Sequence, residues 1–120
     1  MKNPITILYV DDEPINLMLF DVCFNEKYSL ITAESGFVGL EKLEQNSDIS
    51  FVFSDMKMPG MNGIEFITLA KQKFPKLSFY ILTGFGLTDE IIRAIDDGLV
   101  LKCFFKPFDI EEIESVLEKK

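Results

Sequence analysis

The chain has 120 residues, of which 48% are hydrophobic, and its 20 acidic and 12 basic residues give a formal net charge of −8. This length and composition predict that residues 1–120 form one folded domain, and the acidic balance argues against direct binding to nucleic acid or to an anionic membrane. The complete absence of histidine excludes Ser-His-Asp triads, Cys-His pairs and an imidazole acid–base catalyst.

Five short runs of apolar, β-prone residues predict five strands. In chain order they are Ile5–Val10, Ser29–Ala33, Phe51–Ser54, Ser78–Thr83 and Cys103–Phe105. Four of these runs are almost continuously apolar, as expected for central parallel strands that are covered on both faces. The run Ser29–Ala33 alternates more between polar and apolar residues, so it is predicted to lie nearer an edge of the sheet.

Segments with apolar residues at three- and four-residue steps follow the strands and predict five helices. They are Pro14–Phe24 and the segments that begin after the potential N-caps Ser35, Asn62, Thr88 and Asp109. Gly98 is predicted to stop the fourth helix after Asp97, and Asp109 with Glu112 has the spacing of a capping box. Strands that alternate with helices predict a parallel sheet with right-handed crossovers and helices on both faces.

Polar side chains follow four of the predicted strands at the point where each strand ends. They are Asp11 and Asp12, Asp55, Thr83 and Lys106, in chain order. In open α/β sheets, ligands bind beyond the carboxyl ends of the strands. Carboxylates that crowd together there repel one another unless a cation lies among them. Oxygen ligands of this kind suit Mg²⁺.

The sequences YVDDEP, FSDMKMPGMNG, ILTG and FFKPF resemble the strand-end signatures of the two-component receiver domain, in order and over nearly the whole chain. The resemblance implies a flavodoxin-like, doubly wound α/β fold with a five-stranded parallel sheet in the order 2-1-3-4-5. It also implies a phosphoacceptor that switches a partner-binding face and is not an enzyme toward other substrates.

The resemblance assigns roles around a magnesium ion. Asp55 is implied as the phosphoacceptor, whose carboxylate attacks the phosphorus of a phosphohistidine. Asp12 and Asp55, with the backbone carbonyl of Lys57, are implied as Mg²⁺ ligands, and Asp11 is implied to assist mainly through water. Such a metal would offset charge in a loose in-line transition state.

The remaining implied roles concern phosphoryl binding and loop shape. Lys106 is implied to pair with Asp55 before transfer and with the phosphoryl group afterwards. Thr83 would donate its hydroxyl to a phosphoryl oxygen and shift the loop behind it. The peptide bond between Lys106 and Pro107 is implied to be cis. Gly60 and Gly63 are expected to supply unusual backbone angles in the loop after Asp55.

One position departs from the family pattern. Receivers commonly carry a Tyr or Phe three residues before the lysine, whereas this chain has Cys103 there. Phe104 follows it but is expected to face the other side of the sheet, because successive strand residues alternate. Our hypothesis is that a neighbour such as Phe85, or a rearranged helix after Thr83, carries the signal instead.

The phenylalanines divide into a predicted core and a candidate partner patch. The predicted core members are Phe20, Phe24, Phe51, Phe53, Phe66 and Phe79. Phe85, Phe104 and Phe108 are predicted to be partly exposed and to form a patch for a partner. The two cysteines, Cys23 and Cys103, are expected to be buried, reduced thiols because they lie far apart and lack the spacing of a metal or redox motif.

The resemblance implies three partners: a sensor histidine kinase or phosphotransfer protein, a downstream output domain or protein, and a second copy in a phosphorylation-dependent homodimer. We expect no partner membrane and a cytoplasmic location, because no apolar run reaches the roughly 18–20 residues of a span and no leader peptide opens the chain.

Three other interpretations also have to be weighed against the sequence. A pseudo-receiver would share the fold and act as a plain interaction module. A haloacid-dehalogenase-type phosphatase would also phosphorylate an aspartate, but its nucleophile belongs to a DxD pattern, whereas Asp11 and Asp12 are adjacent. A flavin- or nucleotide-binding domain would have a glycine-rich phosphate loop, which this sequence lacks.

Overall fold

A computed structural model describes residues 5–118. The strands are β1 (Thr6–Val10), β2 (Ser29–Ala33), β3 (Ile49–Asp55), β4 (Ser78–Thr83) and β5 (Lys102–Phe105). The helices are α1 (Pro14–Phe24), α2 (Gly36–Gln45), α3 (Gly63–Lys73), α4 (Asp89–Asp96) and α5 (Ile110–Leu117). The strands form one parallel sheet in the order β2-β1-β3-β4-β5. The predicted fold class and strand order are confirmed.

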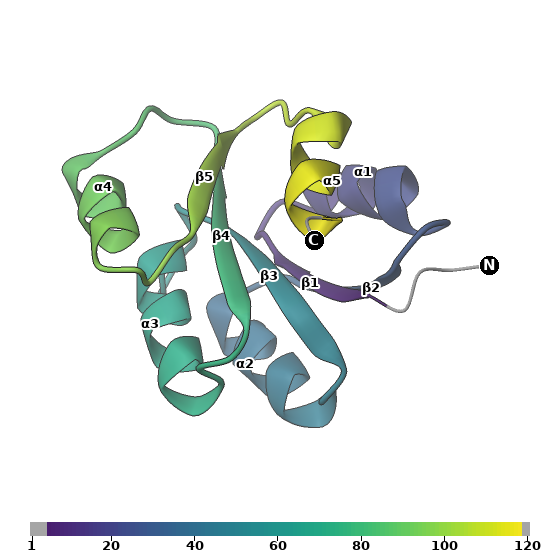
Figure 1. Ribbon diagram of the computed structural model, residues 1–120, viewed down its shortest axis with the longest axis horizontal. Helices are drawn as coiled ribbons and strands as arrows, with labels where there is room; N and C mark the ends of the chain where they lie inside the picture. The colour runs from purple at the N-terminus through teal and green to yellow at the C-terminus, as the bar shows by residue number, and fades with distance from the viewer. Residues whose placement is uncertain (1–4, 119–120) are drawn as a thin grey trace.

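Helices cover both faces of the sheet, with α1 and α5 on one face and α2, α3 and α4 on the other (Figure 1). Each face has its own apolar cluster. Phe20 of α1 and Ile113 of α5 pack against Tyr9 and Phe53 on the first face. Phe66 of α3 belongs to the cluster on the second face. This arrangement explains the continuous apolar runs of β1, β3 and β4, because these central strands have no solvent-facing side. The prediction of a central position is wrong for the run Cys103–Phe105, because β5 lies at an edge of the sheet.

The predicted core phenylalanines are buried with one exception. Phe20, Phe24, Phe53, Phe66 and Phe79 are almost fully buried, and Phe51 is partly buried. The run Ser29–Ala33 forms β2 at one edge of the sheet, as its alternation predicted. β3 is longer than the predicted Phe51–Ser54, and Asp55 is its last residue rather than the first residue of a loop.

Side-chain caps begin four of the helices. The Ser35, Asn62 and Thr88 side chains each accept a hydrogen bond from the backbone N–H three residues on. The capping box predicted at Asp109 is wrong, because the Asp109 side chain accepts from the N–H of Glu111 instead of Glu112. A complete capping box occurs at the start of α3, where the Glu65 side chain also accepts from the Asn62 N–H.

Within residues 5–118, no helix has the length and apolar character needed to cross a membrane. Both cysteines are free thiols, as predicted. The prediction that they are buried is wrong, because Cys23 is exposed on α1 and Cys103 is only partly buried.

Candidate functional site

The carboxyl ends of the parallel strands bring the predicted acidic residues together. One carboxylate oxygen from each of Asp11, Asp12 and Asp55 lies within 4.8 Å of the others. Asp11 and Asp55 are buried, and Asp12 is partly buried. β1 and β3 are neighbours in the sheet, with Val10 paired to Ser54, which explains why residues that follow β1 meet the end of β3.

Lys106 is the cation of this cluster. Its Nζ lies 2.8 Å from Asp11 Oδ2 and 3.3 Å from Asp55 Oδ1. The Lys106 N–H donates to the Thr83 carbonyl over 2.8 Å, which ties the end of β5 to the end of β4. The Lys106–Pro107 peptide bond is cis, as predicted. The lysine is therefore shared between two carboxylates, and the nearer one is Asp11, not Asp55.

Asp55 is a buried carboxylate in a crowded acidic site. Its Oδ1 accepts a hydrogen bond from the Met56 N–H at 2.8 Å. Burial, and then the nearby Asp11 carboxylate, raise the pKa of Asp55, while Lys106 and the Met56 N–H oppose this shift. The balance means that ionised Asp55 is less stable in the folded chain than in water.

We expect Asp55→Asn to stabilise the metal-free protein at pH 7.5 by on the order of 1 kcal/mol. The folded-state pKa of Asp55 is raised above its unfolded value of 3.8, so above the raised pKa its ionisation favours unfolding. That cost disappears as the pH falls to the unfolded value, where the carboxyl is protonated in both states. The advantage of the variant should therefore shrink between pH 7.5 and pH 4.

Urea unfolding of both proteins in EDTA at several pH values measures this difference. Asp48→Asn is the matched control, because Asp48 is exposed and lies just before the opposite end of β3. Equal stability of the wild-type and Asp55→Asn proteins at pH 7.5 would show that ionised Asp55 is not destabilising.

Thr83 is buried at the end of β4, and its Oγ1 accepts a hydrogen bond from the Phe85 N–H at 3.1 Å. The Phe85 side chain is 57% exposed, as predicted for a partner patch. The Lys57 ammonium lies 4.4 Å from the centre of the Phe85 ring. These three residues contribute to the lining of a cavity of about 240 Å³ between the β3–α3 and β4–α4 loops.

Phe104 does not belong to an exposed patch, and that prediction is wrong. Its side chain is 2% exposed and packs with Phe53 and Tyr80 under α1 and α5. Cys103 lies in the apolar cluster on the other face, as strand alternation predicted. Phe108 is partly exposed, as predicted, and its ring contacts those of Phe20 and Phe24 on α1.

The loop after Asp55 uses its two glycines differently. Gly60 has a φ of 79°, the backbone conformation predicted for it. Gly63 has no positive φ, so the predicted reason for its presence is wrong. A Cβ at position 63 would come 2.3 Å from the Asp55 carbonyl oxygen, which is too close for any side chain.

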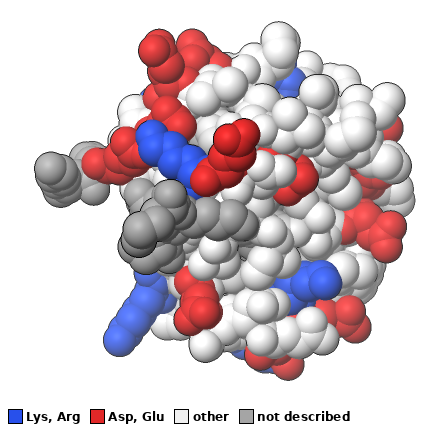
Figure 2. Space-filling view, turned by 90° about the vertical axis from the view of Figure 1, so that its right-hand side faces the viewer, with Lys and Arg blue, Asp and Glu red and all other residues white. Residues whose placement is uncertain are grey.

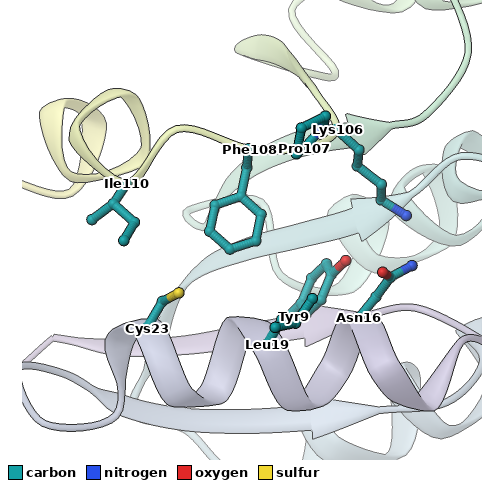
Figure 3. A pocket seen from close by; sticks show the side chains of 8 residues that line it. All are labelled: Tyr9, Asn16, Leu19, Cys23, Lys106, Pro107, Phe108 and Ile110. Carbon is teal, nitrogen blue, oxygen red and sulfur yellow. The ribbon is translucent and has the colours of Figure 1, made fainter.

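An apolar stripe on α1 was not anticipated. Its exposed members occur at helical spacing and are Ile15, Met18, Leu19 and Val22. A cavity of about 470 Å³ lies beside the stripe, between α1 and the segment after β5 (Figure 3). The sequence signal was present, because α1 has apolar residues on both its buried and exposed faces, more than packing against the sheet requires.

Comparison with known proteins identifies a matching family and similar proteins. A family model described as the response regulator receiver domain matches residues 7–118. The chain is 35% identical over 114 residues to Sporulation initiation phosphotransferase F of Bacillus subtilis (strain 168), covering 94% of this chain and 90% of that protein. It is 31% identical to Transcriptional regulatory protein GlrR of Escherichia coli (strain K12), covering 96% of this chain but only 26% of that protein.

Solved structures show the same likeness. A response regulator receiver domain protein from Clostridium thermocellum has 30% sequence identity and a TM-score of 0.84, covering 91% of this chain and 87% of that one. A signal receiver domain of an HD domain-containing protein from Pseudomonas fluorescens Pf-5 has 25% identity and a TM-score of 0.86, covering 96% and 92%. The chain therefore belongs to the response regulator receiver domain family.

Proposed function

We propose that Asp55 is the residue of this receiver that accepts a phosphoryl group, from a phosphohistidine on a sensor kinase or phosphotransfer protein. The observation that carries this proposal is the Lys106 ammonium shared by Asp11 and Asp55 within a cluster of three carboxylates. A pseudo-receiver that acts only by binding a partner would gain nothing from three adjacent carboxylates, whose mutual repulsion destabilises the fold. Phosphohistidine donors are made from ATP, so the proposal also places the chain in the cytoplasm.

The transfer forms one bond and breaks one. An oxygen of the Asp55 carboxylate attacks the phosphorus, and the phosphorus–nitrogen bond to the donor's histidine breaks, with the electron pair leaving on the ring nitrogen. Little covalent chemistry is left to the protein, so its contribution is position and charge. Lys106 is close enough to Asp55 for its ammonium to bind the new phosphoryl oxygens. The Thr83 hydroxyl, at the end of β4, is a second potential hydrogen-bond donor to them.

The cluster fits Mg²⁺. Three carboxylate oxygens lie within 4.8 Å of one another, and hard oxygen donors around a site open to water and phosphate are what this ion prefers. Asp11, Asp12 and Asp55 would hold it, with the carbonyl of Lys57. When bound, Mg²⁺ offsets the negative charge of the carboxylates and of the phosphoryl oxygens.

The α1 stripe is proposed as the contact for the phosphoryl donor. It begins at Ile15, only three residues after Asp12, so a helix packed along it can reach the acidic cluster. Charged side chains on the side of the molecule where α1 and α5 lie leave broad uncharged areas between them (Figure 2). An amphipathic helix that carries the phosphohistidine is the partner chemistry that suits such a surface.

The output side of the switch is proposed to begin at Thr83 and Phe85. The Phe85 N–H already donates to Thr83 Oγ1, so a Thr83 hydroxyl that turns toward a phosphoryl oxygen would pull on this loop. Phe85 is also held by the Lys57 ammonium from the β3–α3 loop. A downstream domain, a separate protein or a second copy would then meet a changed surface next to α4.

The test of phosphoryl acceptance uses acetyl phosphate with Mg²⁺ and intact-mass measurement. The wild type should gain one phosphoryl group that hydroxylamine removes, EDTA should prevent the gain, and Asp55→Asn should abolish it. Asp48→Asn should behave as the wild type. Retained phosphorylation in Asp55→Asn would refute the assignment of Asp55, and rapid turnover of many equivalents would indicate a phosphatase.

The phosphorylated sample also tests the switch. Amide NMR signals of Thr83 and Phe85 should move together on phosphorylation. A Phe85 signal that stays fixed while Thr83 moves would remove Phe85 from the signalling route.

A further inference from the structure

The Tyr9 side chain reaches the acidic cluster from inside the protein. It belongs to β1, two residues before Asp11, and is almost fully buried in the apolar cluster beneath α1 and α5. Its ring stacks on Phe20 with a centroid distance of 4.3 Å and an interplanar angle of 25°. Figure 3 shows the hydroxyl directed toward the side of the cavity where the Lys106 ammonium lies. Packing therefore fixes where this hydroxyl points.

The Tyr9 hydroxyl donates to Asp11 Oδ2 over 2.5 Å. Asp11 is completely buried and accepts two further hydrogen bonds, from the Glu13 N–H to Oδ1 at 3.0 Å and from the Lys106 ammonium to Oδ2 at 2.8 Å. The phenol of Tyr9 supplies the O–H and the Asp11 carboxyl oxygen accepts it, so Tyr9 is the donor in this pair. The three donors together fix the plane of the Asp11 carboxylate.

Lys106 contacts a second carboxylate besides Asp11, whereas the Tyr9 hydroxyl does not. The Lys106 ammonium also contacts Asp55 at 3.3 Å, and in the proposed function it follows the phosphoryl group. The Tyr9 hydroxyl has Asp11 as its one hydrogen-bond partner within residues 5–118. It is therefore the side-chain donor that stays on Asp11 when Lys106 turns toward Asp55, and it prevents a buried carboxylate from losing its side-chain partners.

We propose that Tyr9 is a positioning residue for the acidic cluster: its hydroxyl orients the buried Asp11 carboxylate and thereby strengthens Mg²⁺ binding. This inference rests on the proposed function, because it assigns the cluster to Mg²⁺. A partner that orients a metal-binding group typically changes metal affinity by about 10–100-fold when it is removed. The Tyr9 ring is packed in the apolar core, and this packing holds the hydroxyl in position to donate to Asp11.

The experiment measures Mg²⁺ dissociation constants by amide NMR titration, without a phosphoryl donor. Tyr9→Phe keeps the ring and removes the hydroxyl, and should weaken Mg²⁺ binding about 10-fold. Tyr80→Phe is the matched control, because Tyr80 is buried in the same apolar cluster and stacks on Phe53. It should leave Mg²⁺ affinity within about twofold of the wild type, as expected for independent sites.

A double-mutant cycle separates positioning from general packing. If Tyr9 acts through Asp11, adding Tyr9→Phe to Asp11→Asn should weaken Mg²⁺ binding no further. An unchanged affinity in Tyr9→Phe would overturn the inference, and so would a full additional loss in the double variant. In the wild type, the ring ¹³Cζ signal of Tyr9 should shift when Mg²⁺ is added; a fixed signal would also count against the role, even if a variant failed to fold.

These results are distinct from a failure of the proposed function. Absence of Mg²⁺-dependent phosphorylation in the wild type would reject the function itself. Normal wild-type phosphorylation with unchanged Mg²⁺ affinity in Tyr9→Phe would reject only the role of Tyr9.

Discussion

Lys106→Met is expected to slow phosphoryl acceptance on Asp55 by about 10²-fold, the usual effect of removing one preorganised charge-stabilising donor from a reaction site. Lys106 is the one cation within hydrogen-bonding distance of the described cluster of Asp11, Asp12 and Asp55. Methionine keeps much of the length and apolar volume of the side chain but removes its charge. The anionic donor would then approach three carboxylates with no ammonium between them, and the transferred oxygens would lose a charged hydrogen-bond partner.

Phosphorylation rates with acetyl phosphate at saturating Mg²⁺ measure this effect. Lys102→Met is the matched control, since Lys102 is an exposed residue at the start of the same strand, β5. It makes the same change in net charge, but its ammonium lies over the Phe104 ring at 5.1 Å instead of on a carboxylate. The control should stay within about threefold of the wild-type rate, because distant surface charges are screened by salt. Equal losses in both variants would mean that net charge matters and the Lys106 contact does not.

Most of the fold could be predicted because its signals are local and repeated. Continuous apolar runs separated by helical segments indicate a covered parallel sheet, and the caps Ser35, Asn62 and Thr88 mark helix starts that the structure contains. The strand order itself came from the resemblance. The capping box at Asp109 failed because sequence spacing does not determine which of two neighbouring N–H groups a short side chain reaches.

The membership of the acidic cluster could also be predicted, since parallel strands end at one edge of the sheet. Asp11, Asp12, Asp55 and Lys106 all lie at or just after the end of a strand. Its internal contacts could not. The preference of Lys106 for Asp11 and the hydrogen bond from Tyr9 depend on side-chain conformations set by packing between distant segments.

Exposure was predicted least well, because it depends on which segment covers a residue. Phe104 is apolar and lies near the end of the predicted sheet, but α1 and α5 cover its face. Phe105, its neighbour on β5, is paired in register with Thr83 and half exposed. Strand alternation separates the two rings correctly, but it does not say which of the two faces is open to solvent.

Gly63→Ala is expected to destabilise the protein by about 3 kcal/mol, a large part of the roughly 5–15 kcal/mol that holds a domain of this kind together. A Cβ at this position would lie 2.3 Å from the Asp55 carbonyl oxygen and 3.0 Å from Ile81 Cδ1. The oxygen belongs to the backbone at the end of β3, and the Gly63 N–H is itself bonded to the Met56 carbonyl at 2.8 Å. Neither segment can move away without breaking that contact or shifting the strand end.

Urea unfolding gives the loss of stability, and Gly86→Ala is the matched control. A methyl group added at Gly86 would meet no atom within 4 Å, and the φ of Gly86 is not positive, so its alanine variant should stay within about 0.5 kcal/mol of the wild type. Because the strained atom in Gly63→Ala belongs to Asp55, the folded fraction should also accept phosphoryl groups more slowly. If Gly63→Ala were as stable and as reactive as Gly86→Ala, the loop after β3 would be able to shift at little cost in stability. The position of Asp55 would then not be fixed by close backbone packing.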